Sequence, residues 1–138
     1  MNVKHRSLVL LCSLGLSAAA MAAAPAELIA RYTTEARAAD PAFTGFSATR
    51  GEALHRTQHG GGKADTPACT SCHGEDARAA GRTRAGKSIE PMAASVSPTR
   101  YTDAAKVEKW FKRNCTEVLG RECSAREKGD WLAYMAKQ

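Results

Sequence analysis

The chain has 138 residues, a length that suits one domain, and a formal net charge of +6 at pH 7. Its basic residues are scattered rather than gathered in an arm or stripe, and only 6% of its residues are aromatic, so nucleic-acid binding is not expected. Beyond residue 23, no apolar run is long enough to cross a bilayer, so we expect no membrane-spanning helix in that part of the chain.

Residues 1–23 have the features of a secretory signal peptide. A short positively charged start precedes an apolar stretch that is too short to span a membrane comfortably, and small residues follow it. We expect cleavage near Ala22 or Ala23, which leaves residues 24–138 as one exported domain.

Two helices are expected before the middle of the chain. The first covers residues 25–39, and the Asp40-Pro41 pair ends it. Ser47 is a good N-cap for the second, which runs to about Gln58. Gly51, in the middle of that helix, costs about 1 kcal/mol relative to alanine but allows another helix to cross closely.

Two histidines lie four residues apart on the second helix, His55 and His59. They could bind a metal ion or reach a cofactor, but no acidic residue nearby completes a metal site. We therefore expect an exposed polar pair on an amphipathic helix.

The segment Cys69-Thr70-Ser71-Cys72-His73 has the C-x-x-C-H spacing that attaches a c-type haem. The two thiols can each add to one vinyl group of the porphyrin, and the adjacent histidine then falls under the iron. A zinc site would need a second Cys/His pair at ligand spacing, which is not evident. We predict one covalent haem c on Cys69 and Cys72, with His73 as the proximal iron ligand.

A third helix is expected over residues 103–113, with Thr102 as its cap. An apolar stripe along it contains Val107, Trp110 and Phe111. The next position on that stripe is Asn114, a short amide where an aliphatic residue would be expected.

The cysteine count predicts one disulfide. Cys12 lies in the signal segment, and Cys69 and Cys72 are assigned to haem. Cys115 and Cys123 then remain as an even pair, which predicts a disulfide in an oxidising compartment such as the periplasm.

The last helix opens at a capping box over residues 124–127, and its buried side is expected to contain Trp131, Leu132 and Met135. No segment needs to be a strand. The predicted fold class is therefore all-α, with helices packed around one haem.

Three residue types compete for the sixth position of the iron. Met92 offers a soft thioether, although it follows His73 by only 19 residues, a short arc to the opposite face of the haem. His55 or His59 would give a bis-histidine site. Asn114 is the third candidate, because a buried amide needs a polar partner, but asparagine can equally cap a helix end. The residues alone leave these alternatives open.

Three segments carry a resemblance to a known family: residues 69–74, the Pro91-Met92 pair, and residues 109–123 with their Asn-Cys…Cys element. They resemble the sphaeroides haem protein (SHP) family of oxygen-binding cytochromes c. The similarity covers essentially all of residues 24–138, and the Asn-Cys…Cys element is its most specific part.

The resemblance implies a class I cytochrome c-like fold in which His73 and Asn114 ligate the oxidised iron and Cys115–Cys123 is a disulfide. It further implies that the asparagine leaves the iron on reduction, so that oxygen, nitric oxide or carbon monoxide can bind. Family members are associated with a dihaem cytochrome c and a membrane cytochrome b as electron source.

We therefore expect a periplasmic, high-spin monohaem cytochrome that accepts an electron and then binds a small diatomic ligand, as terminal acceptor of a short electron-transfer chain. The alternative is a simple electron carrier with His/Met ligation through Met92. A third possibility is enzymatic reduction of oxygen or nitrogen oxides. No distal side chain that would deliver protons is identifiable, so the sequence does not decide whether the protein turns over a substrate.

Overall fold

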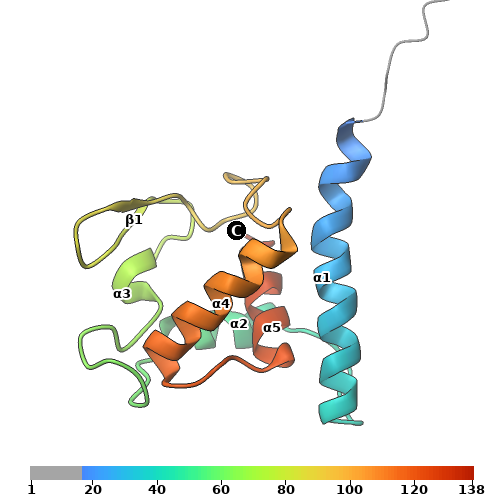
Figure 1. Ribbon diagram of the computed structural model, residues 1–138, viewed down its shortest axis with the longest axis horizontal. Helices are drawn as coiled ribbons and strands as arrows, with labels where there is room; N and C mark the ends of the chain where they lie inside the picture. The colour runs from blue at the N-terminus through green and yellow to red at the C-terminus, as the bar shows by residue number, and fades with distance from the viewer. Residues whose placement is uncertain (1–16) are drawn as a thin grey trace, which may run out of the picture.

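The computed structural model describes residues 17–138 (Figure 1). Within them the chain forms five helices and one short hairpin: α1 (Ser17–Ala39), α2 (Ala48–Arg56), α3 (Thr70–His73), β1 (Gly81–Arg82), β2 (Ser88–Ile89), α4 (Ala104–Leu119) and α5 (Ala125–Met135). None of these helices is long and apolar enough to cross a membrane. Most of the predicted signal peptide lies outside the described residues.

The predicted caps of α2 and α5 are confirmed. The Ser47 hydroxyl accepts the Arg50 backbone N–H at 3.3 Å at the start of α2. At the start of α5, Ser124 and Glu127 form the expected capping box, in which each side chain accepts from the backbone of the other. Both helices therefore begin where local side-chain chemistry satisfies their first free N–H groups.

The cap predicted for α4 is wrong by one residue. Asp103, rather than Thr102, accepts the backbone N–H of Lys106, at 3.0 Å. The Thr102 hydroxyl instead donates to the carbonyl of Thr99 in the preceding turn. A carboxylate at this position also interacts favourably with the positive end of the helix.

Other features also differ from the sequence prediction. α2 ends at Arg56 rather than near Gln58, and α4 continues beyond residue 113 to Leu119. α1 begins at Ser17, so the predicted cleavage near Ala22 or Ala23 falls in its N-terminal turns. β1 and β2 form an antiparallel pair, with Gly81 opposite Ile89, so the expectation that no strand occurs is wrong in this detail. The fold remains mostly helical, because each strand has only two residues.

α2 and α5 cross in direct backbone contact at Gly51, a close approach that the glycine allows. A Cβ atom at Gly51 would overlap the Asp130 carbonyl and lie 2.9 Å from the backbone nitrogen of Trp131. Beside this crossing the buried Asp130 carboxylate accepts the backbone N–H of Ser47 and is paired with Arg50 through Nε at 2.7 Å. A glycine and a satisfied buried charge together hold these helices at close range.

α1 packs against α4 and α5 through one apolar face, made of Leu28, Tyr32 and Ala36. The fully buried Tyr32 donates its hydroxyl to Glu108 on α4, and Lys128 on α5 binds the other oxygen of that carboxylate at 2.8 Å. One acidic side chain thus joins three helices.

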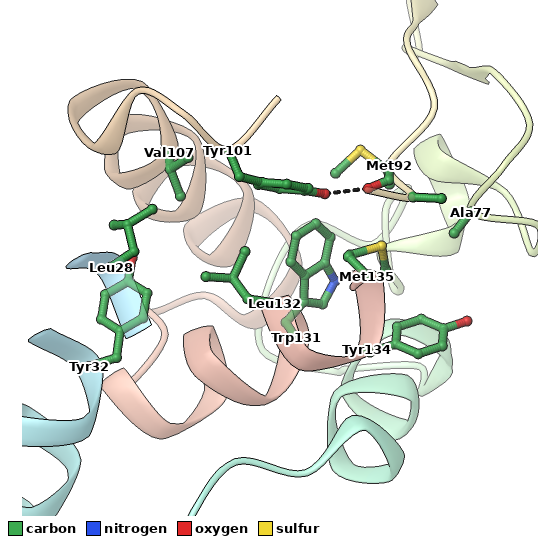
Figure 2. Close-up of a cluster of buried hydrophobic side chains, with 11 residues drawn as sticks. Leu28, Tyr32, Ala77, Met92, Tyr101, Val107, Trp131, Leu132, Tyr134 and Met135 are labelled. Carbon is green, nitrogen blue, oxygen red and sulfur yellow. Dashed lines mark hydrogen bonds between the residues drawn. The ribbon is translucent and has the colours of Figure 1, made fainter. Parts of the chain in front are cut away.

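The hydrophobic core lies where α4, α5 and the segment before α4 meet. Figure 2 shows the Trp131 ring between Tyr101 and Met135. The ring centroid of Trp131 lies 6.2 Å from that of Tyr101 and 5.5 Å from that of Phe111, both edge to face. These edge-to-face pairs add stabilisation beyond their buried area and place a tryptophan behind the site described next.

Candidate functional site

The C-x-x-C-H segment forms the short helix α3, with Cys69 at its N-cap position. Gly74 ends it with a left-handed φ of 72°, which glycine adopts without strain, and donates its N–H to the Thr70 carbonyl at 2.9 Å. The chain returns close behind α3, since a Cβ atom on Gly81 would overlap the carbonyl of Cys72. The thiols and the histidine are therefore held on one tightly turned segment.

Cys69 and Cys72 are both free and half-buried. Burial raises the pKa of the Cys69 thiol to about 11, and burial followed by the nearby Glu117 raises that of Cys72. Both thiols are therefore protonated at neutral pH. Within residues 17–138, no group of three or more His, Cys, Asp or Glu side chains is placed to hold a metal ion, so the geometry does not extend this pair into a zinc site.

His73 has a buried Nδ1 atom with no hydrogen-bond partner in the described part of the chain. Burial, helped by the proximity of His55 and Arg100, lowers the pKa of His73 to about 4, so its imidazole is neutral in ordinary buffers. The neutral imidazole is the form that binds iron. Two unpaired thiols beside a neutral histidine fit a covalently attached haem.

His55 is fully buried, so the prediction of an exposed histidine pair is wrong for this residue. Its Nδ1 lies 3.3 Å from Nε1 of Trp131, and its Nε2 lies 3.3 Å from the carbonyl oxygen of Gly74. His55 follows Gly51 by four residues and shares its helix face, so the close approach of α5 at Gly51 covers His55 as well. That i, i+4 relation to a glycine was the available signal in the sequence.

His59 lies beyond the end of α2 and is half-buried. Its Nε2 is 3.0 Å from the carbonyl oxygen of Leu54 within the same segment. The two histidines therefore have different surroundings and do not form a pair.

Asn114 lies inside α4, half-buried. The hypothesis that it caps a helix end is wrong, because α4 continues to Leu119 and Gly120 forms the C-cap with φ 71°. Among the described residues, no hydrogen bond from its side-chain amide to another residue is found. Asn114 thus presents an amide without a hydrogen-bond partner within residues 17–138.

The predicted disulfide is present next to Asn114. Cys115 and Cys123 are bonded, with 5.6 Å between their Cα atoms, and both are buried. The bond closes the last turn of α4 and the loop that leads to α5. The residue beside Asn114 is therefore anchored covalently.

The apolar stripe of α4 differs from the predicted one at Trp110. Val107 is buried and Phe111 half-buried, but Trp110 is 43% exposed, with the guanidinium of Arg113 5.4 Å from its ring centroid. The buried stripe instead continues through Cys115 and Val118. A helical stripe can be read from spacing, whereas its edges depend on what packs against it.

A glycine loop between α2 and α3 joins the α3 segment to the end of α4. A Cβ atom on Gly61 would overlap the carbonyl of Leu119, and the Lys63 backbone N–H donates to the Glu117 carbonyl at 2.8 Å. The structure thereby ties the segment that carries His73 to the helix that carries Asn114, through these backbone contacts and an ion pair between the side chains of Lys63 and Glu117 at 3.5 Å.

Met92 lies in the hydrophobic core with 6% of its surface exposed. Its backbone N–H donates to the Ala77 carbonyl at 2.8 Å, and its carbonyl accepts the Tyr101 hydroxyl (Figure 2). Methionine commonly fills gaps between apolar side chains, and Met92 packs among such side chains here.

Comparison with known proteins gives consistent similarities. Residues 41–135 match the family described as Domain of unknown function (DUF1924). The chain is 50% identical to the Cytochrome c-type protein SHP of Cereibacter sphaeroides over 133 residues, which is 96% of this chain and 98% of that protein. The structure of oxidised SHP, described as an oxygen binding cytochrome c, superposes with a TM-score of 0.76 over 83% of this chain and 96% of that one, at 50% identity.

A second relative is cytochrome c'' of Methylophilus methylotrophus. It is 34% identical over 110 residues, which is 79% of this chain and 76% of that protein. Its solution structure, which addresses the structural basis of haem-ligand detachment, has a TM-score of 0.70 at 34% identity and covers 82% of this chain and 92% of that one.

Proposed function

We propose that this protein is an exported cytochrome with one covalent haem, whose iron binds a small diatomic ligand after reduction. The chain belongs to the SHP family of c-type cytochromes, and the proposal starts from that membership. The observation that carries this proposal is the partnerless Asn114 amide on α4, held beside the Cys115–Cys123 disulfide. Oxidised SHP is an oxygen binding cytochrome c and supports the choice of ligand class.

Cys69 and Cys72 would hold the haem, and His73 would supply the proximal nitrogen. Supporting observations are the two free thiols, the neutral imidazole and the positive φ of Gly74, which turns the chain away directly after the histidine. Haem bound in this way supplies a redox-active iron with a position for a small ligand.

Asn114 would ligate the oxidised iron through its amide oxygen. A neutral oxygen donor is a hard, weak ligand and suits ferric better than ferrous iron. On reduction the side chain would leave, and its NH₂ group would remain beside the open position as a hydrogen-bond donor. Work on haem-ligand detachment in cytochrome c'' supports a ligand that leaves.

The alternative is a His/Met electron carrier that uses Met92. The burial of Met92 among core side chains gives its sulfur a structural role and favours Asn114 over Met92 as ligand. The two functions differ in one property, since only the first opens a coordination position on reduction.

The periplasm is part of the proposal, because thioether attachment of haem and a structural disulfide both belong to oxidising compartments. So is an electron supply from a dihaem cytochrome c and a membrane cytochrome b. Two residues of the disulfide loop, Arg121 and Glu122, are exposed, which leaves the loop that follows α4 accessible.

Optical spectra of the oxidised, reduced, and reduced, carbon monoxide-treated holoprotein test the proposal. We expect ferrous high-spin bands that change on addition of carbon monoxide, and no ferric absorption near 695 nm, about where Met–iron ligation is seen. A 695 nm band together with a ferrous spectrum that ignores carbon monoxide would establish the Met92 alternative.

Asn114→Ala sharpens the test. The ferric spectrum should change to that of a water-bound or open iron, while carbon monoxide binding to the ferrous form persists, because His73 is untouched. Lys109→Ala, an exposed position on the same helix, is the matched control and should match the parent protein. An Asn114→Ala variant with the parent's ferric spectrum contradicts the assignment.

A further inference from the structure

His55 is a fully buried histidine that the proposed function does not use. It comes from α2, but its ring lies between α5 and the exit of α3, and its ring centroid is 5.8 Å from that of Tyr134 and 6.4 Å from that of His73. A buried polar ring is costly unless both nitrogens are satisfied. Here both are.

The partners of His55 determine which nitrogen carries its hydrogen. The indole nitrogen of Trp131 can only donate, so Nδ1 of His55 must accept. Nε2 then carries the hydrogen and donates to the carbonyl oxygen of Gly74, which can only accept. The result is a chain of hydrogen bonds with one direction, from Trp131 through His55 to Gly74.

Gly74 is the residue directly after His73. It combines φ 72° with ψ 176°, an arrangement that aims its carbonyl at α2 while the chain turns away from α3. Glycine has many accessible conformations, so a hydrogen bond that fixes its carbonyl also fixes the turn. The position of the His73 backbone follows from that turn.

The anchor at the other end of the chain is rigid. Trp131 lies in the core between Tyr101 and Met135 (Figure 2), and Gly51 brings α5 into backbone contact with α2 just one turn before His55. The His55 ring is fully buried between its two partners. The His55 imidazole therefore links the packing of α5 in the core to the end of α3.

We propose that His55 is a positioning residue for the proximal ligand: by holding the Gly74 carbonyl, it sets the placement of His73 relative to the iron. This inference rests on the proposed function, in which His73 ligates haem iron. Removing a group that supports a metal ligand commonly lowers the metal affinity or the activity by about 10-fold or more.

His55→Phe keeps an aromatic ring of similar shape and removes both hydrogen bonds. In the reduced holoprotein we expect the iron–histidine stretching band in resonance Raman spectra to broaden and move to lower frequency. The dissociation constant for carbon monoxide should rise about 10-fold. Circular dichroism of the same samples reports whether the variant is folded.

Three further variants make the test specific. His55→Gln carries an amide N–H that can reach Gly74, so it should restore the parent band in part. Trp131→Phe removes only the donor to Nδ1 and should shift the band less than His55→Phe. His59→Phe, at a half-buried histidine whose side chain bonds only the Leu54 carbonyl, is the matched control and should leave the band unchanged.

A folded His55→Phe holoprotein with the parent's band and carbon monoxide affinity overturns the positioning role while leaving the proposed function intact. Should His55→Phe not fold, Trp131→Phe decides, and an unchanged band in that variant overturns the role. A parent protein whose ferrous iron stays six-coordinate and ignores carbon monoxide overturns the proposed function and this inference with it.

Discussion

His73 and Asn114 lie on two elements that the protein fastens by different means. The α3 segment is backed by the core, through the chain from Trp131 to His55 to Gly74 and the close crossing of α2 and α5. The end of α4 is instead held by the Cys115–Cys123 disulfide and by the backbone contacts of the glycine loop.

The difference matters for a ligand that stays and a ligand that leaves. His73 would remain on the iron in both oxidation states, and its support is buried and directional. Asn114 would leave on reduction, and its amide makes no hydrogen bond to another described residue that would have to break. A tether on its neighbour limits how far it can move without holding the side chain itself.

The largest effect is expected at the buried crossing. Gly51→Ala would force a methyl group into the backbone of Asp130, which cannot move aside as a flexible side chain could. We expect the free energy of unfolding of the holoprotein to fall by about 3 kcal/mol in urea denaturation.

Gly60→Ala is the control for that substitution. A Cβ atom at Gly60 meets no heavy atom within 4 Å, so its free energy of unfolding should stay within about 0.5 kcal/mol of the parent. Equal losses at the two glycines would show that the α2–α5 contact is not the tight joint described.

A smaller effect is expected at the disulfide that holds the end of α4. Replacing both disulfide cysteines, Cys115→Ala with Cys123→Ala, opens a loop whose ends are eight residues apart. The free energy of unfolding should fall by about 2–3 kcal/mol, mainly through the unfolded chain. Each single substitution should cost about as much as the double, because either one removes the same bond. A heterogeneous ferric spectrum should accompany the loss, whereas an unchanged spectrum would mean that the disulfide does not order Asn114.

The smallest effect is expected where the disulfide loop meets the start of α5. Glu127 caps α5 and accepts two hydrogen bonds from Arg121 of the disulfide loop, at 2.7 and 2.8 Å. The Arg121 guanidinium, and then the capping bonds from Ser124, hold the pKa of Glu127 at about 2 despite partial burial. Glu127→Gln should lower the free energy of unfolding by about 1 kcal/mol at pH 7.

The pH dependence of that effect has a definite sign. The folded-state pKa is below the usual value of 4.5, so the ionised carboxylate stabilises the fold above pH 4.5, and this contribution is lost as pH falls towards about 2. The gap between the parent and Glu127→Gln should therefore shrink over this range. Glu35→Gln, at an exposed carboxylate on α1, should change stability by less than about 0.5 kcal/mol. A gap that stays constant down to pH 2 would contradict the assigned role of Glu127.

The sequence by itself determined the features that depend on neighbours along the chain. The haem-attachment motif, the caps at Ser47 and Ser124 and the disulfide all follow from residue type and short spacing, and each is where the sequence placed it, with the haem attachment itself left to experiment. Local chemistry suffices here because the groups involved meet within a turn or a loop.

Only the tertiary structure decided which polar side chains are buried and which apolar ones are not. His55 was expected in solvent and lies in the core, Trp110 was expected on the buried stripe and is exposed, and Asn114 proved to lie inside a helix rather than at its end. The physical reason is that burial depends on which helix packs against which, and the spacing of residues along one helix does not say where another helix crosses it.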